Sequence, residues 1–204
     1  MKCLLNESTE ERIKAAAAKI FMEKGFDGTT TRDIAKEAGL NSALMNYYFR
    51  SKEKLFAGVF DEMCELFFHG LTEILSQPLS FKEKILALID HDFKIFRENP
   101  ALSNFILNEL HRNPERLIDI AKKASSIRST VLEKQFNDAV ASGEIRNVDI
   151  KHILLLIPAN IQFIFISKPL TMKIHNMCEN DFELFLDEHI KVVKEMVVNY
   201  LFLK

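Results

Sequence analysis

Signals that start and stop helices recur along the whole chain, and they constrain its fold more than any other feature. Ser8 with Glu11 and Ser80 with Glu83 have the spacing of capping boxes, in which side chains satisfy helix-terminal amides. Apolar residues follow such starts at steps of three and four, and no segment alternates as a strand does. Only 6 glycines and 5 prolines leave few turns. The sequence therefore predicts an all-α fold of about nine helices.

Two short helices joined by a tight turn have the proportions of a helix-turn-helix. They are expected over residues 30–38 and 42–49, after a first helix over residues 9–24. Ala35 provides a small residue where the two helices touch, and Gly39 allows the chain to turn. Polar and basic side chains that suit base edges and phosphates crowd around the second of these helices. They are Asn46, Tyr47, Tyr48, Arg50, Lys52 and Lys54.

The runs over residues 30–40 and 47–55 resemble the DNA-binding domain of the tetracycline-repressor (TetR) family, and the likeness covers about residues 8–58. The resemblance implies that the helix over residues 42–49 enters the major groove of double-stranded DNA. It also implies a homodimer that reads an inverted repeat. The DNA-binding positions that it assigns are Thr30, Thr31, Arg32, Ser42, Ala43, Leu44, Asn46, Tyr47, Tyr48 and Lys52.

The roles within that set differ. The resemblance implies base-edge contacts by Ser42, Ala43, Leu44 and Asn46, phosphate contacts by Thr30, Tyr47, Tyr48 and Lys52, and a base contact by Arg32. Lys52 would add a charge at a helix N-terminus, which already favours anions. Ser42, Ala43 and Asn46 depart from the residues common in the family, so the operator sequence stays open. Packing explains Met45 and Phe49 better, and solvation explains Arg50 and Lys54 better.

Basic and acidic residues are distributed only slightly unevenly along the chain. The net charge is −2 overall, while residues 1–58 carry ten basic against eight acidic side chains. DNA binding therefore rests on the motif and not on bulk charge. We expect the chain to divide within or just after the fourth helix, near residues 52–60. The predicted parts are a helix-turn-helix DNA-binding domain over 1–55 and a ligand-sensing and dimerisation domain over 56–204.

Composition excludes several other classes. The 3 cysteines are widely spaced, which favours neither a disulfide framework nor a metal site, and no cofactor motif is present. No signal peptide is evident, and the most apolar segment, 153–166, is too short to span a membrane. We expect a cytoplasmic protein without membrane association. No nucleophile elbow or phosphate-binding loop is found, so an enzyme is not expected and no catalytic residue is assigned.

Polar and aromatic residues within apolar stretches of the second part are candidates for an effector pocket. The set comprises His91, Phe105, Asn108, His111, Gln162 and Phe163. Taken one at a time, each is explained more easily as a packed aromatic or a hydrogen-bonded polar group. The spacing of the histidines and acidic residues does not place two metal ligands on one helical face. An excess of phenylalanines suits a cavity for an apolar effector.

Two late helices carry more apolar surface than one subunit covers, which predicts self-association through residues 154–166 and the last helix. The resulting hypothesis is a repressor that a small hydrophobic effector of unknown identity releases from an inverted-repeat operator. The alternative is a DNA-binding dimer that is controlled by a protein partner and has no small-molecule ligand. A fully packed C-terminal core would favour this alternative, whereas a cavity would favour the first hypothesis.

Overall fold

The computed structural model describes residues 8–203, apart from the side chains of residues 46, 66, 121 and 123–130. This part of the chain forms ten α-helices and no strand, so the prediction of an all-α fold is confirmed. The helices are α1 (Thr9–Lys24), α2 (Thr31–Glu37), α3 (Ser42–Phe49), α4 (Lys52–Ser76), α5 (Phe81–Glu98), α6 (Ala101–Arg112), α7 (Pro114–Ala141), α8 (Ile150–Ile166), α9 (Lys168–His175) and α10 (Glu179–Leu201).

The additional helix relative to the predicted nine is α9. It follows α8 after Ser167, carries a proline in its first turn and ends at Asn176, whose φ is 51°. Its 8 residues make only about two turns, too few for an apolar period to stand out. Within the described residues no single helix is long and apolar enough to cross a membrane. The bent pair of α8 and α9, which meet at 64°, passes that test together by length and composition only.

Local capping explains where the first helix starts and ends. The Ser8 hydroxyl accepts from the amide of Glu11 at 3.2 Å, and the Glu11 carboxylate accepts from the amide of Ser8 at 2.8 Å. This reciprocal pair satisfies two amides that the helix leaves unbonded. Gly25 ends α1 with a φ of 69°, a conformation that glycine adopts without strain. The observed bounds of α1 match the predicted 9–24.

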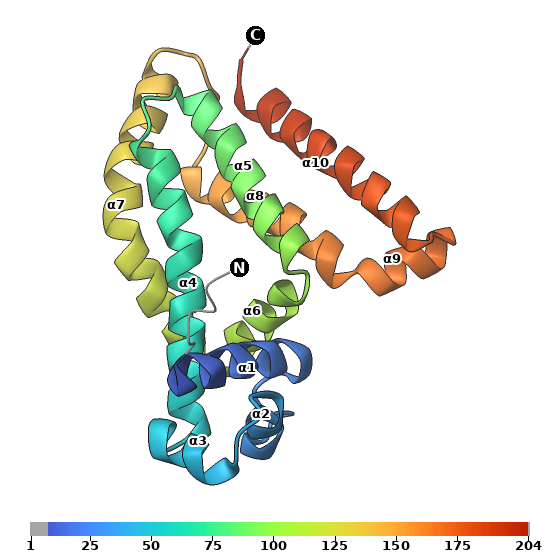
Figure 1. The fold of residues 1–204 in the computed structure, drawn as a ribbon. Helices are drawn as coiled ribbons and strands as arrows, with labels where there is room; N and C mark the ends of the chain where they lie inside the picture. The colour runs from blue at the N-terminus through green and yellow to red at the C-terminus, as the bar shows by residue number, and fades with distance from the viewer. Residues whose placement is uncertain (1–7, 204) are drawn as a thin grey trace, which may run out of the picture.

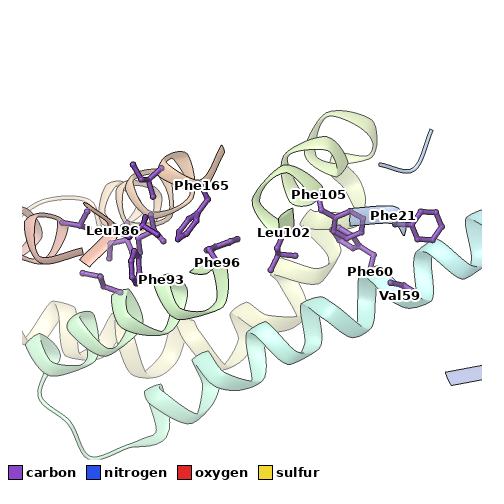
Figure 2. Packing of buried hydrophobic residues seen from close by; sticks show 14 of the residues in the cluster. Phe21, Val59, Phe60, Phe93, Phe96, Leu102, Phe105, Phe165 and Leu186 are labelled. Carbon is purple, nitrogen blue, oxygen red and sulfur yellow. The ribbon is translucent and has the colours of Figure 1, made fainter. Parts of the chain in front are cut away.

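Figure 1 shows α1, α2 and α3 gathered at one end of the long helix α4, with α7 alongside α4 and α10 on the opposite side of the molecule. The buried core is continuous between these parts: Phe21, Phe60 and Phe105 lie together at the end of α4, as Figure 2 shows. Helix α4 runs without a break across the predicted boundary between residues 55 and 56. That boundary stays a prediction.

Candidate nucleic-acid interface and effector cavity

The turn between α2 and α3 is held by a glycine conformation and by one long-range hydrogen bond. Gly39 adopts a φ of 65°, which favours glycine. From α1, Arg12 donates through Nη2 to the carbonyl oxygen of Ala38 at 2.7 Å. At the start of α2 the Thr30 hydroxyl accepts from the amide of Asp33 at 3.1 Å, as its predicted capping role requires. These bonds fix the direction in which α3 is presented.

Helix α3 buries one side and leaves the other in solvent. Met45 is 1 % exposed and Phe49 is partly buried, so their predicted place in the core is confirmed. Tyr47 is 79 % exposed and Tyr48 is 41 % exposed, and their rings lie edge to face with centroids 5.5 Å apart. Asn41 starts the helix by accepting from a backbone amide of its first turn at 2.9 Å. The exposed described residues of α3 are Ser42, Ala43, Leu44, Tyr47 and Tyr48.

The remaining predicted DNA contacts lie beside this face. Arg32 is exposed in the first turn of α2, next to the partly buried Thr31. Thr30 donates its hydroxyl hydrogen to Asp33 at 2.6 Å, so this group already serves the cap. Asn46 lies in α3, but its side chain is outside the described residues. The structure therefore brings Arg32 and the exposed face of α3 to one end of the molecule.

Asp33 joins the start of α2 to the end of α1. Its carboxylate accepts from the Thr30 hydroxyl and, at 3.0 Å, from Nζ of Lys24. The hydrogen bond from Thr30, followed by that from Lys24, holds the pKa of this carboxyl well below its usual range. The Asp33 carboxylate is therefore ionised at neutral pH and keeps Lys24 paired.

Lys52 has a role within the structure that the sequence did not indicate. Its Nζ donates to the carbonyl oxygens of Phe26 and Thr29, each at 2.9 Å, and lies 4.2 Å from the centroid of the Phe26 ring. These contacts tie the first turn of α4 to the loop between α1 and α2. In this conformation the ammonium turns toward that loop, and its phosphate contact stays a prediction.

Two apolar cavities, which we call the inner cavities, lie among α4 to α8. Their volumes are about 150 and about 190 Å³. Phe67, Phe68 and Gln162 line both, so the two cavities adjoin each other. Phe60 and Phe105 are among the other residues of the smaller cavity. The smaller cavity is rich in phenylalanine, whereas the larger one is mostly aliphatic and also includes Asp92. Concave, mostly apolar spaces with a few polar groups are typical of ligand sites.

The residues predicted for an effector pocket separate into four places, of which that of His91 is described below. Phe105 and Gln162 line the smaller inner cavity. Asn108 and His111 line a different space, an open cleft between α6 and the end of α1, which we call the junction cleft. Phe163 is 65 % exposed on the outer side of α8 and lines neither space. Its exposed side of α8 is the surface for which the apolar sequence predicted self-association.

His91 lies between α5 and α4. A Cβ on Gly70 would come within 2.1 Å of the His91 ring, so only a glycine permits this approach. The ring Nε2 lies 3.2 Å from the carbonyl oxygen of Phe67, a residue of both inner cavities. His91 therefore packs behind a cavity wall. Among the described residues no group of three histidine, cysteine, aspartate or glutamate side chains is placed to hold a metal ion.

A partly buried ionic network where α6 and α7 meet α4 was missed by sequence reasoning. Glu109 is 1 % exposed and binds Arg112 at 2.7 Å and Arg116 at 3.1 Å. Arg116 also lies 3.5 Å from Asp61 of α4, and the Arg112 guanidinium lies 4.0 Å from the centroid of the Phe26 ring. The three-residue spacing of Glu109 and Arg112 is the sequence signal that could have revealed part of it, whereas Arg116 reaches Glu109 from the next helix.

Further residues of the inner cavities were also absent from the predicted set. Met63, Phe67 and Phe68 of α4 lie in their walls, with Phe96 of α5. In the sequence they belong to apolar stretches that core packing explains equally well. Only the position of α4 against α6 and α8 distinguishes a cavity wall from a filled core.

A short helix that presents an exposed polar and aromatic face across a glycine turn defines a helix-turn-helix DNA-binding protein. Residues 13–59 match the family described as bacterial regulatory proteins, tetR family. The transcriptional regulator RutR of Escherichia coli (strain K12) is 24% identical over 193 residues, or 93% of this chain and 88% of RutR. The probable regulator YttP of Bacillus subtilis is 29% identical over 109 residues, so this chain spans 51% of its length.

A solved structure shares the fold over most of both chains. The regulator FadR of Bacillus subtilis, in complex with stearoyl-CoA, matches with a TM-score of 0.64 and 19% identity, covering 89% of this chain and 96% of that one. The N-terminal part of this chain therefore matches the DNA-binding domain of the TetR family of bacterial regulators, as the sequence resemblance implies. The family and these relatives are regulators of transcription and not enzymes.

Proposed function

We propose that the protein is a cytoplasmic, homodimeric repressor that binds an inverted-repeat operator and is released by a small hydrophobic effector. The exposed face of α3 is the observation that carries the DNA-binding part. Tyr47, at 79 % exposure, and the adjacent Tyr48 have large rings that packing does not use. Aromatic rings with polar tips suit phosphate and base contacts. The helix presents them at the tip of the molecule, beside the exposed Arg32.

We assign two kinds of DNA contact to this surface. Ser42, Ala43, Leu44 and Asn46, in the first half of α3, read base edges in the major groove. Thr30, Thr31, Tyr47, Tyr48 and Lys52 hold phosphates, and Arg32 reaches a base. The exposed positions of Ser42, Ala43 and Leu44 support the first assignment. Lys52 needs to leave its loop carbonyls, at least in part, to reach a phosphate.

The outer faces of α8 and α10 form the proposed dimer interface. Large apolar side chains stand exposed along both helices, including Leu155, Phe163, Leu184, Val192 and Met196. Contiguous apolar surface of this kind marks an interaction site in a soluble protein. A two-fold axis through this face would pair the same helices of two copies and present two α3 helices to an inverted repeat.

The inner cavities support the effector part of the proposal. Their mostly apolar lining suits an apolar molecule, and Gln162, which lines both, could orient it by hydrogen bonding. FadR of Bacillus subtilis, which shares this fold, was solved with stearoyl-CoA, an apolar chain on a large polar group. A protein-controlled dimer without a ligand would be favoured by a fully packed core, so the cavities favour the ligand-responsive form.

Helix α4 provides a physical connection between effector and operator. It begins at Lys52, beside the loop between α1 and α2, and carries Met63 and Phe67 into the cavity wall. An effector that changes how α4 packs therefore also changes the direction of α3. Coupling of this kind is typically worth about 1–3 kcal/mol, or roughly 5- to 150-fold in operator affinity.

Binding of the purified dimer to the DNA that flanks its own gene tests the proposal. We expect saturable binding of one dimer per site and a steep loss of affinity with salt, because phosphate contacts release counterions. An Arg32→Ala variant should lose affinity, whereas Lys94→Ala, an exposed position of α5, serves as the matched control. Genome-wide selection of bound fragments extends the search when the operator lies elsewhere. Binding that never exceeds that to random DNA would refute the regulator assignment.

A further inference from the structure

The junction cleft lies where the C-terminal helices meet the end of α1. Its volume is about 420 Å³, larger than either inner cavity. The loop over residues 25–28 and Phe56 of α4 form one side, and Phe105, Asn108 and His111 of α6 form the other. A molecule in this cleft would touch the N-terminal helices and the C-terminal part of the chain at once.

One aromatic ring lies between the junction cleft and the smaller inner cavity. Phe105 lines the cleft and also lines the smaller inner cavity. Its ring lies 5.5 Å from the ring of Phe56 and 5.2 Å from that of Phe60, measured between centroids. Figure 2 shows Phe105 of α6 beside Phe60 of α4. The Phe105 side chain therefore contacts both the polar cleft and the apolar smaller cavity.

In the cleft, some of the described polar side chains have no hydrogen-bond partner in the protein, whereas the positively charged side chains are already paired. Lys24 is paired with Asp33 at 3.0 Å, and Arg112 is paired with Glu109 at 2.7 Å. Among the described residues, the side chains of Asn108 and His111, both exposed to solvent, make no hydrogen bond to another protein group. The Asn108 amide nitrogen lies 3.7 Å from the position that a Cβ on Gly25 would take, so this amide stands against the loop.

The charge of the cleft disfavours an anionic group. Asp27 adds a carboxylate to the wall, and the lining cations that the structure describes already have partners. An incoming carboxylate would meet this repulsion and would compete for paired charges. An amide or a hydroxyl can both donate to and accept from Asn108 and His111 at no such cost.

We propose that the effector is a linear aliphatic molecule with an uncharged hydrogen-bonding head group. Its chain fills the inner cavities and its head lies in the junction cleft, with the Phe105 ring turned aside. This inference rests on the effector site proposed above. Because a dry cavity of about 150 Å³ accepts a benzene-sized group, the two cavities suit a chain of roughly ten to twelve carbons.

Calorimetric titration of the full-length dimer with three probes tests the head-group assignment. Decanamide carries an uncharged head, decanoate a charged one, and hexane fills one cavity without any head. We expect decanamide to bind at least about tenfold more tightly than decanoate. Asn108→Ala should weaken decanamide about tenfold and leave hexane unchanged. Asn104→Ala, an exposed asparagine of the same helix outside the cleft, is the matched control and should change neither.

The outcomes separate this inference from the proposed function. Equal affinities for decanamide and decanoate, or equal effects of Asn108→Ala and Asn104→Ala, overturn the head-group assignment while the cavity stands. If decanamide binds but operator affinity stays unchanged, the regulatory switch is refuted and the binding site is retained. If none of the three probes binds, the head-group assignment and the proposed effector site are both overturned. Asp27→Asn provides a second check, because it should strengthen decanoate and leave decanamide unchanged.

Discussion

The exposed face of α3 and the inner cavities are built in opposite ways. The exposed face of α3 consists of side chains within 8 consecutive residues. The Asn41 cap and the turn at Gly39 hold this helix in place. The inner cavities collect side chains from α4 to α8, such as Phe60 and Gln162, which lie far apart in the chain. A face made by one short helix can change its side chains independently of the core. The side chains that line a cavity cannot change independently of the core, because each of them also packs in it.

This difference sets what substitutions do in each region. Removing an exposed side chain of α3 costs little stability, since surface changes usually stay within about 0.5 kcal/mol. Truncating a buried aromatic residue of a cavity wall typically costs about 3–5 kcal/mol. Function and stability are therefore separable at α3 and coupled in the cavity. Lys52, a predicted DNA contact that also bonds two loop carbonyls, should fall between these cases.

The largest effect is expected from a charge on the exposed face of α8. Phe163→Glu places a carboxylate without a partner in the proposed dimer interface. We expect the dimer to dissociate and operator affinity to fall by on the order of a hundredfold or more, because two linked half-site contacts become separate. Sedimentation equilibrium and fluorescence anisotropy measure the two quantities. Ile118→Glu, at an exposed apolar position of α7, is the control, and a Phe163→Glu protein that stays dimeric contradicts this interface.

The next effect concerns the exposed face of α3. Tyr47→Ala should weaken operator binding by roughly 10- to 100-fold, as expected for the loss of a contact worth about 1–3 kcal/mol. The melting temperature should not change, since the side chain is 79 % exposed. Tyr47→Phe separates the hydroxyl contact from the ring contact. Unchanged affinity in the alanine variant would remove Tyr47 from the interface.

Lys52 tests whether a single residue can serve both DNA binding and the stability of the fold. Lys52→Met keeps the apolar stem and removes the ammonium that bonds two loop carbonyls. We expect a loss of about 2 kcal/mol in the free energy of unfolding, from hydrogen bonds to a charged group. Urea denaturation measures it, with the exposed Lys54→Met as control. Unchanged stability with weaker operator binding would instead support phosphate contact as the main role of Lys52.

The smallest effect is the pH dependence at the start of α2. Hydrogen bonds from Thr30 and Lys24 lower the pKa of Asp33 below its ordinary value of 3.8. A carboxyl whose pKa is lowered on folding contributes stability above its unfolded pKa and loses that contribution as the pH falls below it. Asp33→Asn should therefore be less stable than the natural protein at neutral pH, with a difference that narrows in acid. Thermal denaturation of both proteins between neutral and acid pH measures the difference, and a difference that stays constant contradicts this role of Asp33.

Several features of the two regions could be predicted from the sequence because their causes are local. The capping boxes, the glycine turn and the four-residue spacing of Met45 and Phe49 each depend on neighbouring residues, and the structure has them all. Helix α9 escaped prediction because two turns give no apolar period. Lys52 escaped because the carbonyls of Phe26 and Thr29 reach it only in the folded chain.

The sequence by itself determined the all-α fold and the bounds of α1 and α3, since capping and periodicity act within a few residues. Its motif over the N-terminal helices also indicated the resemblance to the TetR family, which the match over residues 13–59 supports. Only the tertiary structure decided which of the candidate pocket residues lie together. It placed Gln162 in the inner cavities, Asn108 in the junction cleft and Phe163 on the outer face of α8. A helix has the same apolar period whether a neighbour fills its groove or leaves it empty. A cavity therefore depends on how helices distant in sequence pack against one another.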